Sequence, residues 1–460
     1  MGSQSDPHTL PDADSPALVL THPTEAEKNQ TWSLNHGEWG GALSLQEYLD
    51  REPYLTTIPL SADGGMTHWI LSDTHEASPG DDKQRPVLAS CESIRKRVLY
   101  VPKATVTAAN GNSAGLSIAD VREGTGYGVC SVYTYPHFRG RRYAGRMMGE
   151  LGPALRTWPH RQHDKTPLPA VDEDAHTQST GGVTIHGAGE EAVCSALWSD
   201  IGKKFYAKKG WVPFPSSHVE IAGLSDHELE LVSSTTTAAA AAADASATEP
   251  ITYANLSSLC AEDELLLCEL LLRHAQATGR TSFAFAPDHD ALRWHLYRDE
   301  FIAKLVFPDR APSELKGCIA RTTPSSTTAT AAGTAQNKKP SRVWAIWTRN
   351  YAAADPASCA DKNTLYILRL VIEDERASED ELAAALRTVL DAARREAGIW
   401  HCGKIHMWNP TALVQRLLEQ SGIAHQMVER DTDSIPSLMW YGDDETDNVE
   451  WVASEKYCWC

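Results

Sequence analysis

The chain has 460 residues, of which 42% are hydrophobic and 22% charged, and its formal net charge is −19. This length favours two domains over one, with enough apolar residues for large cores. The acidic excess, 61 Asp and Glu against 42 Lys and Arg, argues against a general nucleic-acid or anionic-membrane binder and suits a cationic substrate.

The cysteines and the first residues favour a reduced, intracellular protein. The ten cysteines are dispersed, without a C-x-x-C pair or a Cys/His cluster at zinc-finger spacing, so we expect no metal site. The first ten residues are polar and no apolar run reaches about 18 residues, which predicts a soluble, cytoplasmic protein with no membrane segment. We interpret the closing Cys458-Trp459-Cys460 as an ordinary tail.

Three stretches of unusual composition interrupt the chain. An Ala- and Thr-rich stretch at 233–250 predicts a linker, 322–341 a surface loop inside a domain, and 159–189 an insertion. The predicted division is an N-terminal domain over 1–228, a low-complexity linker over 229–250 and a C-terminal domain over 251–460.

The N-terminal domain opens with two helical patterns, for which Thr24 and Ser44 are the expected N-caps. A Gly-rich loop between them holds Glu38 and Trp39. Strands follow at MTHWILSD, RPVLASCESIRKRVLYV and GYGVCSVYTY, and later at AVCSALWSD and VPFPSSHVEI, the last closing the domain. The predicted order is α, α, β, β, β, α, β, α, β, an α+β fold with a mixed sheet.

The stretch PHFRGRRYAGRMMGEL, residues 136–151, concentrates positive charge at a strand-to-helix turn. A helix N-terminus leaves about four unpaired N–H groups, and a slim turn lets a pyrophosphate approach them. Guanidinium groups match phosphate oxygens, although a solvated basic turn has the same pattern. Gly152-Pro153 should break or kink the helix. The candidate anion-binding residues are Arg139, Gly140, Arg141, Arg142, Ala144, Gly145 and Arg146.

A second pattern, SDIGKKFYAKKGW, predicts a short helix between Asp200 as N-cap and Gly210. Within it Phe205 has core spacing with Ile201, and Tyr206 points to an adjacent face. Tyr206 is therefore either a packing residue at the edge of the core or a catalytic group.

The C-terminal half alternates strands and helices. Strands are expected at SFAFA, RVWAIWTRN, TLYILRLVIED and KIHMWNP, and helices over DHDALRWHLYRDEFIAK, EDELAAALRTVLDAARREAG and TALVQRLLEQSG. No Arg-Gly-rich loop follows these strands, so we expect no second phosphate site there.

Taken together, the basic turn and the Tyr206 helix resemble the GCN5-related N-acetyltransferase fold over roughly residues 24–221. The family's acetyl-CoA motif is Arg/Gln-x-x-Gly-x-Gly/Ala, which the chain matches at Arg139 and Ala144 and departs from at Arg142, usually Gly. Several blocks look like the fungal lysine N6-acetyltransferases of lysine catabolism. They are WGGALSLQEYLDRE, VLASCESIRKRVL, HFRGRRYAGRMM, SDIGKKFYAKKGWVPFPSSH and SIPSLMWYG.

The resemblance implies acetyl transfer from acetyl-CoA to the N6 amine of L-lysine by direct attack in a ternary complex. It implies that Val132 and Tyr133 lend backbone groups to the pantetheine arm and an N–H to the oxyanion, and that Tyr206 protonates the departing thiolate. It also implies a second, degenerate acetyltransferase-like domain that shapes the substrate pocket and binds no cofactor of its own.

The sequence leaves the general base and the acceptor open. A lysine amine has a pKa of about 10.4 and must lose a proton before attack, for which Glu92 and Glu38 are the candidates. The rival functions are acetylation of another small amine or a peptide, and a non-catalytic acyl-CoA binder. The oligomeric state cannot be predicted from these patterns.

Overall fold

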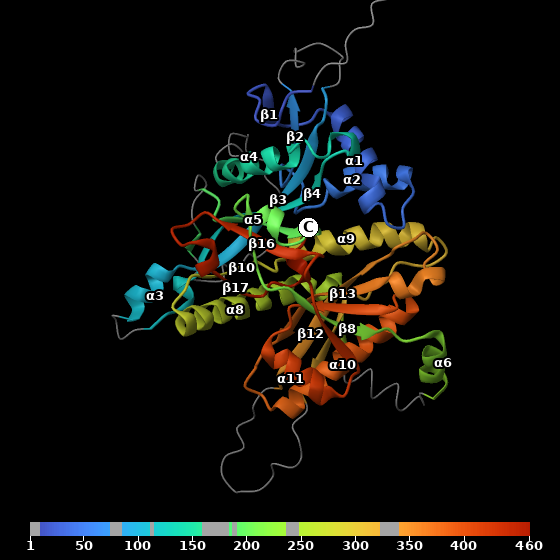
Figure 1. Cartoon of the computed structure of the whole chain (residues 1–460). Helices are drawn as coiled ribbons and strands as arrows, with labels where there is room; N and C mark the ends of the chain where they lie inside the picture. Colours follow the sequence, from blue (N-terminus) through green and yellow to red (C-terminus); the bar gives the residue numbers. More distant parts are fainter. Residues whose placement is uncertain are drawn as a thin grey trace, which may run out of the picture.

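The computed structural model describes residues 10–73, 85–110, 115–158, 184–185, 191–235, 248–322 and 340–460. Two mixed β-sheets are stacked, with helices between them and on their outer faces (Figure 1). The expected α+β class with mixed sheets is therefore confirmed.

The first sheet, sheet A, has ten strands, with β1-β2-β3-β4-β6-β16-β7 along its main path. The paired neighbours are antiparallel except β4 with β6, β4 with β5, and β10 with β17. Its strands are β1 (Leu18–Thr21), β2 (Met66–Asp73), β3 (Ala89–Val101), β4 (Arg122–Tyr133), β5 (Thr184–Ile185), β6 (Cys194–Ser199), β7 (Val212–Pro213), β10 (Ser282–Phe285), β16 (Ile435–Trp440) and β17 (Glu450–Trp451).

The second sheet, sheet B, has seven strands in the order β15-β8-β14-β13-β12-β11-β9. Only β13 and β14 pair in parallel. Its strands are β8 (Ser217–Ala222), β9 (Thr248–Ile251), β11 (Gly317–Arg321), β12 (Arg342–Asn350), β13 (Thr364–Ile372), β14 (Lys404–Trp408) and β15 (His425–Glu429).

The two sheets exchange strands. The strand β8, expected to close the N-terminal domain, lies in sheet B between β15 and β14. In return β16, from the SIPSLMWYG block, lies in sheet A between β6 and β7, and β10 pairs with β3. The domain boundaries near 228 and 250 stay predictions, but a cut there would take strands from both sheets.

The helices match most of the sequence patterns. Thr24 and Ser44 cap their helices in capping boxes, as predicted. The first helix, however, continues through Glu38 and Trp39, so the loop predicted there was wrong, and α4 does not break at Gly152-Pro153. The helices α3, α6 and α8 were not predicted. The bounds are α1 (Glu25–Trp39), α2 (Leu45–Leu55), α3 (Lys103–Asn110), α4 (Tyr143–Thr157), α5 (Lys204–Ala207), α6 (Asp226–Thr235), α8 (Tyr253–Thr278), α9 (His289–Val306), α10 (Glu379–Ile399) and α11 (Ala412–Ser421).

Three buried cores define the layers. The helix α4 packs through Met147 and Leu151 on one face of sheet A. The opposite face packs against α8 and α9, which also contact sheet B, so one core joins the two sheets. The helices α10 and α11 cover the outer face of sheet B. Successive side chains of β12 point to opposite faces of sheet B. Trp344 packs in the core between the two sheets and Val343 in the core under α10 and α11, so both faces of the strand need apolar residues.

Several sequence predictions fall largely outside the described residues. The predicted insertion at 159–189 is described only at β5, the predicted loop at 322–341 only at its two ends, and the linker only up to residue 235 and from residue 248. Within the part of the chain that the structure describes, none of the helices combines the length and hydrophobicity that a membrane crossing requires.

Candidate active site

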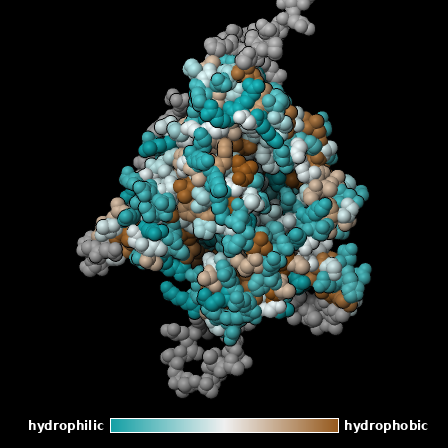
Figure 2. All heavy atoms as spheres, in the orientation of Figure 1, coloured by the Kyte–Doolittle hydropathy of each residue, from teal (hydrophilic) through white to brown (hydrophobic). Residues whose placement is uncertain are grey.

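A cavity of about 700 Å³ lies where sheet A meets the C-terminal half of the chain. Figure 2 shows hydrophobic residues gathered in the middle of this face, around the place where Figure 1 marks the C-terminal end. The charged side chains that line the cavity are Glu38, Arg51, Glu52, Glu92, Arg139, Asp200 and Arg298. Its aromatic lining residues are Trp39, Tyr48, Tyr133, Trp198, Phe205, Tyr206, Trp294 and Trp459.

The cavity opens where two parallel strands stop pairing. The strands β4 and β6 pair from Gly126 to Val129 on β4, whereas β4 continues to Tyr133 and lines the cavity beyond the last pair. Against β3 on its other side, the register shifts near Glu92, and Ser131 has a positive φ of 52°. This bulge leaves the edge of Cys130–Tyr133 that faces β6 without a strand partner among the described residues.

The space between the ends of β4 and β6 connects the two faces of sheet A. Leu197 and Tyr206 line the cavity and belong to the core on the α4 face. Trp198 and Trp294 also line it but belong to the core shared with the C-terminal half. Two molecules can therefore reach one point from opposite faces, as a two-substrate transfer requires.

The basic turn lies at the α4 end of the cavity. The side chain of Arg142, the N-cap residue of α4, makes no capping hydrogen bond, which leaves the first N–H groups of the helix available to an anion. Gly140 has φ +80°, a left-handed conformation that favours glycine. Arg142, at the position where the family usually has Gly, also has a left-handed conformation, with φ +67°. Although Arg142 replaces the usual Gly of the motif, its backbone has the left-handed conformation that Gly would adopt easily.

The remaining predicted turn residues differ in what they contact. The Arg139 Nε donates to the Thr134 carbonyl at 3.0 Å, and its Nη2 lies 3.7 Å from Glu38. Arg141 is exposed, and Ala144 lines the cavity. Arg142 pairs with Asp14 and Arg146 with Glu150.

The structure adds one cation to the basic turn that the sequence did not single out. An added Cβ at Gly145 would lie 3.5 Å from the Lys209 Nζ. The lysine ammonium therefore lies beside the first turn of α4, where it can supplement the arginines. The only hint in the sequence was the basic stretch Lys208-Lys209-Gly210 after Tyr206, which does not predict that Lys209 lies beside Gly145.

Glu92 is held at the centre of the cavity. The indole Nε1 of Trp32 donates to Oε1 at 3.1 Å, the Ser131 hydroxyl donates to Oε2 at 2.9 Å, and the His68 Nε2 lies 3.3 Å from Oε1. Burial alone raises the pKa of Glu92, but His68, Trp32 and Ser131 outweigh it and lower the pKa. The carboxylate is thus ionised at neutral pH and can accept a proton.

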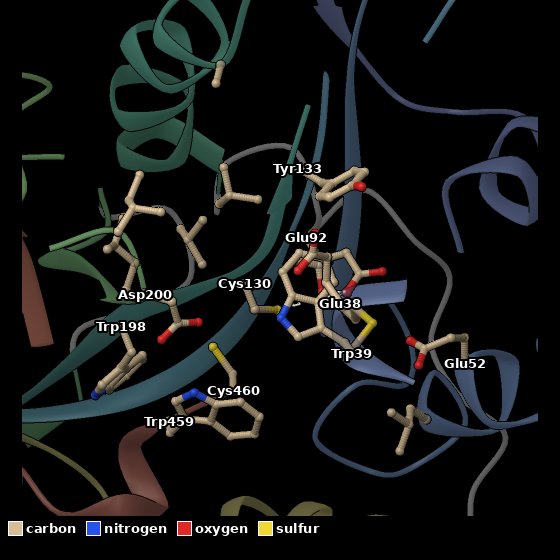
Figure 3. Close-up of a pocket in the computed structure, with 18 of the residues that line it drawn as sticks. Glu38, Trp39, Glu52, Glu92, Cys130, Tyr133, Trp198, Asp200, Trp459 and Cys460 are labelled. Atoms are coloured by element: carbon tan, nitrogen blue, oxygen red, sulfur yellow. Dashed lines mark hydrogen bonds between the residues drawn. The ribbon is translucent and has the colours of Figure 1, made fainter. Parts of the chain in front are cut away.

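The other predicted base, Glu38, has a different environment. Its side chain is 54% exposed and lies at the cavity wall beside Arg139. Figure 3 shows Glu38 and Trp39 beside Glu92 and Tyr133. Glu38 has one exposed ion-pair partner, whereas three side chains fix the position of the buried Glu92 carboxylate, so the geometry favours Glu92.

Tyr206 lies in the cavity wall, on α5, and is buried. Burial, with the charges of Cys91 and Asp200, raises its pKa. The phenol therefore keeps its proton at neutral pH and can donate it. Asp200, predicted as the N-cap of this helix, is not the cap, because α5 begins at Lys204. It lines the cavity instead, with the Ser434 N–H donating to it at 2.9 Å.

The last residues of the chain are part of the site, so interpreting Cys458-Trp459-Cys460 as an ordinary tail was wrong. Trp459 and Cys460 line the cavity, and Figure 3 shows them facing Asp200 and Cys130. The buried Lys96 ammonium donates to the carbonyls of Cys458 and Trp459 at 2.7 and 3.0 Å. The sequence signal was the density of Trp and Cys, which is typical of buried residues.

Among the described residues, His218, Glu220 and His406 have potential metal-ligand atoms within 4.8 Å of one another. Lys404 already lies 3.6 Å from Glu220, and burial with the charges of His406 and Arg430 lowers the pKa of His218 to about 4. The Lys404 ammonium and the Arg430 guanidinium oppose a divalent ion, whereas the neutral imidazole of His218 does not, and the expectation of no metal stays a prediction.

Residues 232–460 match the family model described as GNAT_LYC1-like, the LYC1 GNAT-like C-terminal domain. This match agrees with the acetyltransferase-like second half expected from the sequence.

Two curated relatives are distant. The chain is 23% identical over 295 residues to the uncharacterized protein YGR111W of Saccharomyces cerevisiae, covering 60% of this chain and 62% of that protein. It is 22% identical over 195 residues to a lysine acetyltransferase of Yarrowia lipolytica, covering 42% of this chain and 39% of that protein. The chain thus spans less than two thirds of the length of either relative.

Two solved structures are also similar to the chain. A probable N-acyltransferase from Enterococcus faecalis gives a TM-score of 0.42 at 10% identity, covering 92% of this chain and 71% of that one. A GCN5-related N-acetyltransferase from Kribbella flavida gives 0.39 at 13% identity, with 92% and 71% covered.

Proposed function

We propose that this protein is an N-acetyltransferase that transfers acetyl from acetyl-CoA to the N6 amine of free L-lysine, in lysine degradation. The observation that carries the proposal is the cavity at the parted ends of β4 and β6, where Glu92 and Tyr206 both line the wall. The GNAT-like match and the distant lysine acetyltransferase support the reaction class and the acceptor.

The α4 turn fits the phosphates of the co-substrate. The uncapped helix N-terminus, Arg139, Arg141 and Lys209 would bind them. The free edge of β4 at Val132 and Tyr133 would pair with the pantetheine arm. When bound there, acetyl-CoA supplies the thioester carbonyl that the amine attacks.

The residues around Glu92 would carry the protons. The Glu92 carboxylate would take the proton of the attacking ammonium, directly or through one water, so that the amine lone pair forms the C–N bond. A β4 backbone N–H at Val132 or Tyr133 would donate to the carbonyl oxygen as it gains charge. The Tyr206 hydroxyl would donate its proton to sulfur as the C–S bond breaks, and the second proton that the nitrogen loses on becoming an amide would return through water to the Tyr206 oxygen.

A thiol-release assay with acetyl-CoA and a panel of amines tests the proposal. L-lysine should give the highest kcat/KM, and mass spectrometry should place the acetyl group on N6. Preference for a polyamine, another amine or a peptide would favour another acceptor. Acetyl-CoA binding without thiol release would favour a non-catalytic acyl-CoA binder. The cytoplasmic location stays a prediction.

A further inference from the structure

One cation in the cavity has no hydrogen-bonded or ion-paired partner among the described residues. Arg298 lines the cavity from α9 of the C-terminal half. Among the residues that the structure describes, none forms a hydrogen bond or an ion pair with its guanidinium, whose nearest recorded contact is the Trp459 ring, 5.7 Å from Cζ. Burying a guanidinium without a partner is costly, and buried charges are generally paired, so a bound anion would stabilise Arg298.

The neighbouring charges do not supply that anion. Burial, then the charge of Arg51, lowers the pKa of Arg298 to about 10. The acidic side chain that most attracts Arg298 is Glu52, which already pairs with another cation, because the Arg51 Nε donates to its Oε1 at 2.9 Å. The next residue along α9, Asp299, is paired with Arg349 at 3.1 Å. The guanidinium of Arg298 therefore remains available.

The anion is not the pyrophosphate of the co-substrate. The α4 turn lies on the face of sheet A that packs in the α4 core, whereas α9 belongs to the core between the two sheets. Trp294, one turn before Arg298 on α9, also lines the cavity and belongs to that second core. Arg298 thus lies on the face from which the acceptor enters.

We propose that Arg298 is the anchor for a carboxylate of the acceptor, so that the acceptor is a small amine that also carries a carboxylate, a free amino acid. The inference deepens the proposed function and rests on it for the amine. Planar guanidinium groups bind carboxylates through two parallel hydrogen bonds. The aromatic walls at Trp39, Trp294 and Trp459 suit the aliphatic chain between the carboxylate and the amine.

The charges around Arg298 also favour a free amino acid over the two rival acceptors, a polyamine and a lysine within a protein. A polyamine would place a second ammonium beside Arg298 and Arg51, which like-charge repulsion disfavours. A lysine within a protein has its carboxyl group in a peptide bond and would leave Arg298 without an anion. Only an acceptor with a free carboxylate satisfies the guanidinium.

The test compares L-lysine with 1,5-diaminopentane, which has the same amine-bearing chain and no carboxylate. Full-length protein, Arg298→Gln and the control Arg293→Gln are assayed for thiol release. Arg293 is on the same helix but donates to the Tyr297 hydroxyl and does not line the cavity. The unmodified protein should prefer L-lysine, and Arg298→Gln should lower the lysine-to-diamine ratio of kcat/KM by about 10- to 100-fold, mainly through the KM for lysine.

The KM for acetyl-CoA should move less than twofold in Arg298→Gln, and Arg293→Gln should keep the parent ratio. A ratio in Arg298→Gln within twofold of the parent would overturn the inference. Titration calorimetry with L-lysine separates the two proposals. If no amine gives thiol release, the acetyltransferase proposal fails, and lysine binding that Arg298→Gln abolishes would still support the carboxylate anchor. Absence of lysine binding to the unmodified protein would overturn it.

Discussion

The indole N–H of Trp32 on α1 donates a hydrogen bond of 3.1 Å to the Glu92 carboxylate on β3. The two residues are both buried and belong to elements that are far apart in sequence. This contact ties the first helix of the chain to the centre of the cavity, and it orients the carboxylate toward the end of β4.

We predict that Glu92→Gln lowers kcat for lysine acetylation by about 10²- to 10⁴-fold, because the amide cannot accept the proton. The KM for acetyl-CoA should change little. Glu38→Gln is the matched control, since Glu38 is exposed at the same cavity and was the other base candidate. Steady-state kinetics of both variants decides between them, and a larger loss in Glu38→Gln would reverse the assignment.

The stabilising effect of Glu92 should depend on pH. Its folded-state pKa lies below the usual 4.5, so the unfolded chain binds the proton more tightly. The carboxylate therefore contributes stability above about pH 4.5, and this contribution disappears as the pH falls through the lowered pKa. Urea unfolding of the parent and Glu92→Gln should show a free-energy difference that is constant from pH 7 to about pH 5.5 and shrinks below about pH 4.5. A difference that grows on acidification would contradict the lowered pKa.

Much of this site could be anticipated from the sequence, and the reasons for the rest are specific. The basic turn, Tyr206 and Glu92 were found because local patterns carry them: a strand, a helix start and a motif. Arg298, Asp200 and Trp459 were missed because their place depends on pairings between residues hundreds of positions apart, as with Lys96 and Cys458. The sequence likewise predicted that β8 is a strand and singled out the block that contains β16. It could not predict which sheet each strand joins, because their partners lie far away in the chain.

Tyr206→Phe should lower kcat by about 10²-fold and leave the KM for both substrates within about twofold, because the ring stays and only the proton donor is lost. The neighbouring Phe205→Leu is the control for packing, since Phe205 lines the same wall and has no acidic group. Circular dichroism should show that both variants fold. Turnover of Tyr206→Phe at the parent rate would make Tyr206 a packing residue.

Reversing the charge of the basic turn should weaken acetyl-CoA binding. Arg141→Glu should raise its KM by about tenfold or more, because Arg141 is exposed and free to approach a phosphate. Lys209→Glu should act in the same direction, as the Lys209 ammonium lies beside Gly145. Arg273→Glu, on α8 and outside the cavity wall, is the control. Unchanged affinity in calorimetry of both turn variants would remove the turn from the site.

The last prediction concerns the exchange of strands between the sheets. Because β10, β16 and β17 belong to sheet A, a chain that ends at Ser234 lacks three strands of that sheet. It also leaves β8 without its partners β14 and β15. Such exposed edges and the lost shared core would cost far more than the few kcal/mol of a domain's net stability. The shortened chain should therefore not fold.

For the same reason the full chain should unfold in one cooperative step when followed by tryptophan fluorescence and by circular dichroism. Co-expression of residues 1–235 with residues 236–460 should restore a folded complex that binds acetyl-CoA, because the two pieces together carry every strand of both sheets. Two separate unfolding transitions, or a stable chain ending at Ser234 that binds acetyl-CoA, would show that the N-terminal half folds without β16. The exchanged strands would then be an addition to an independent domain.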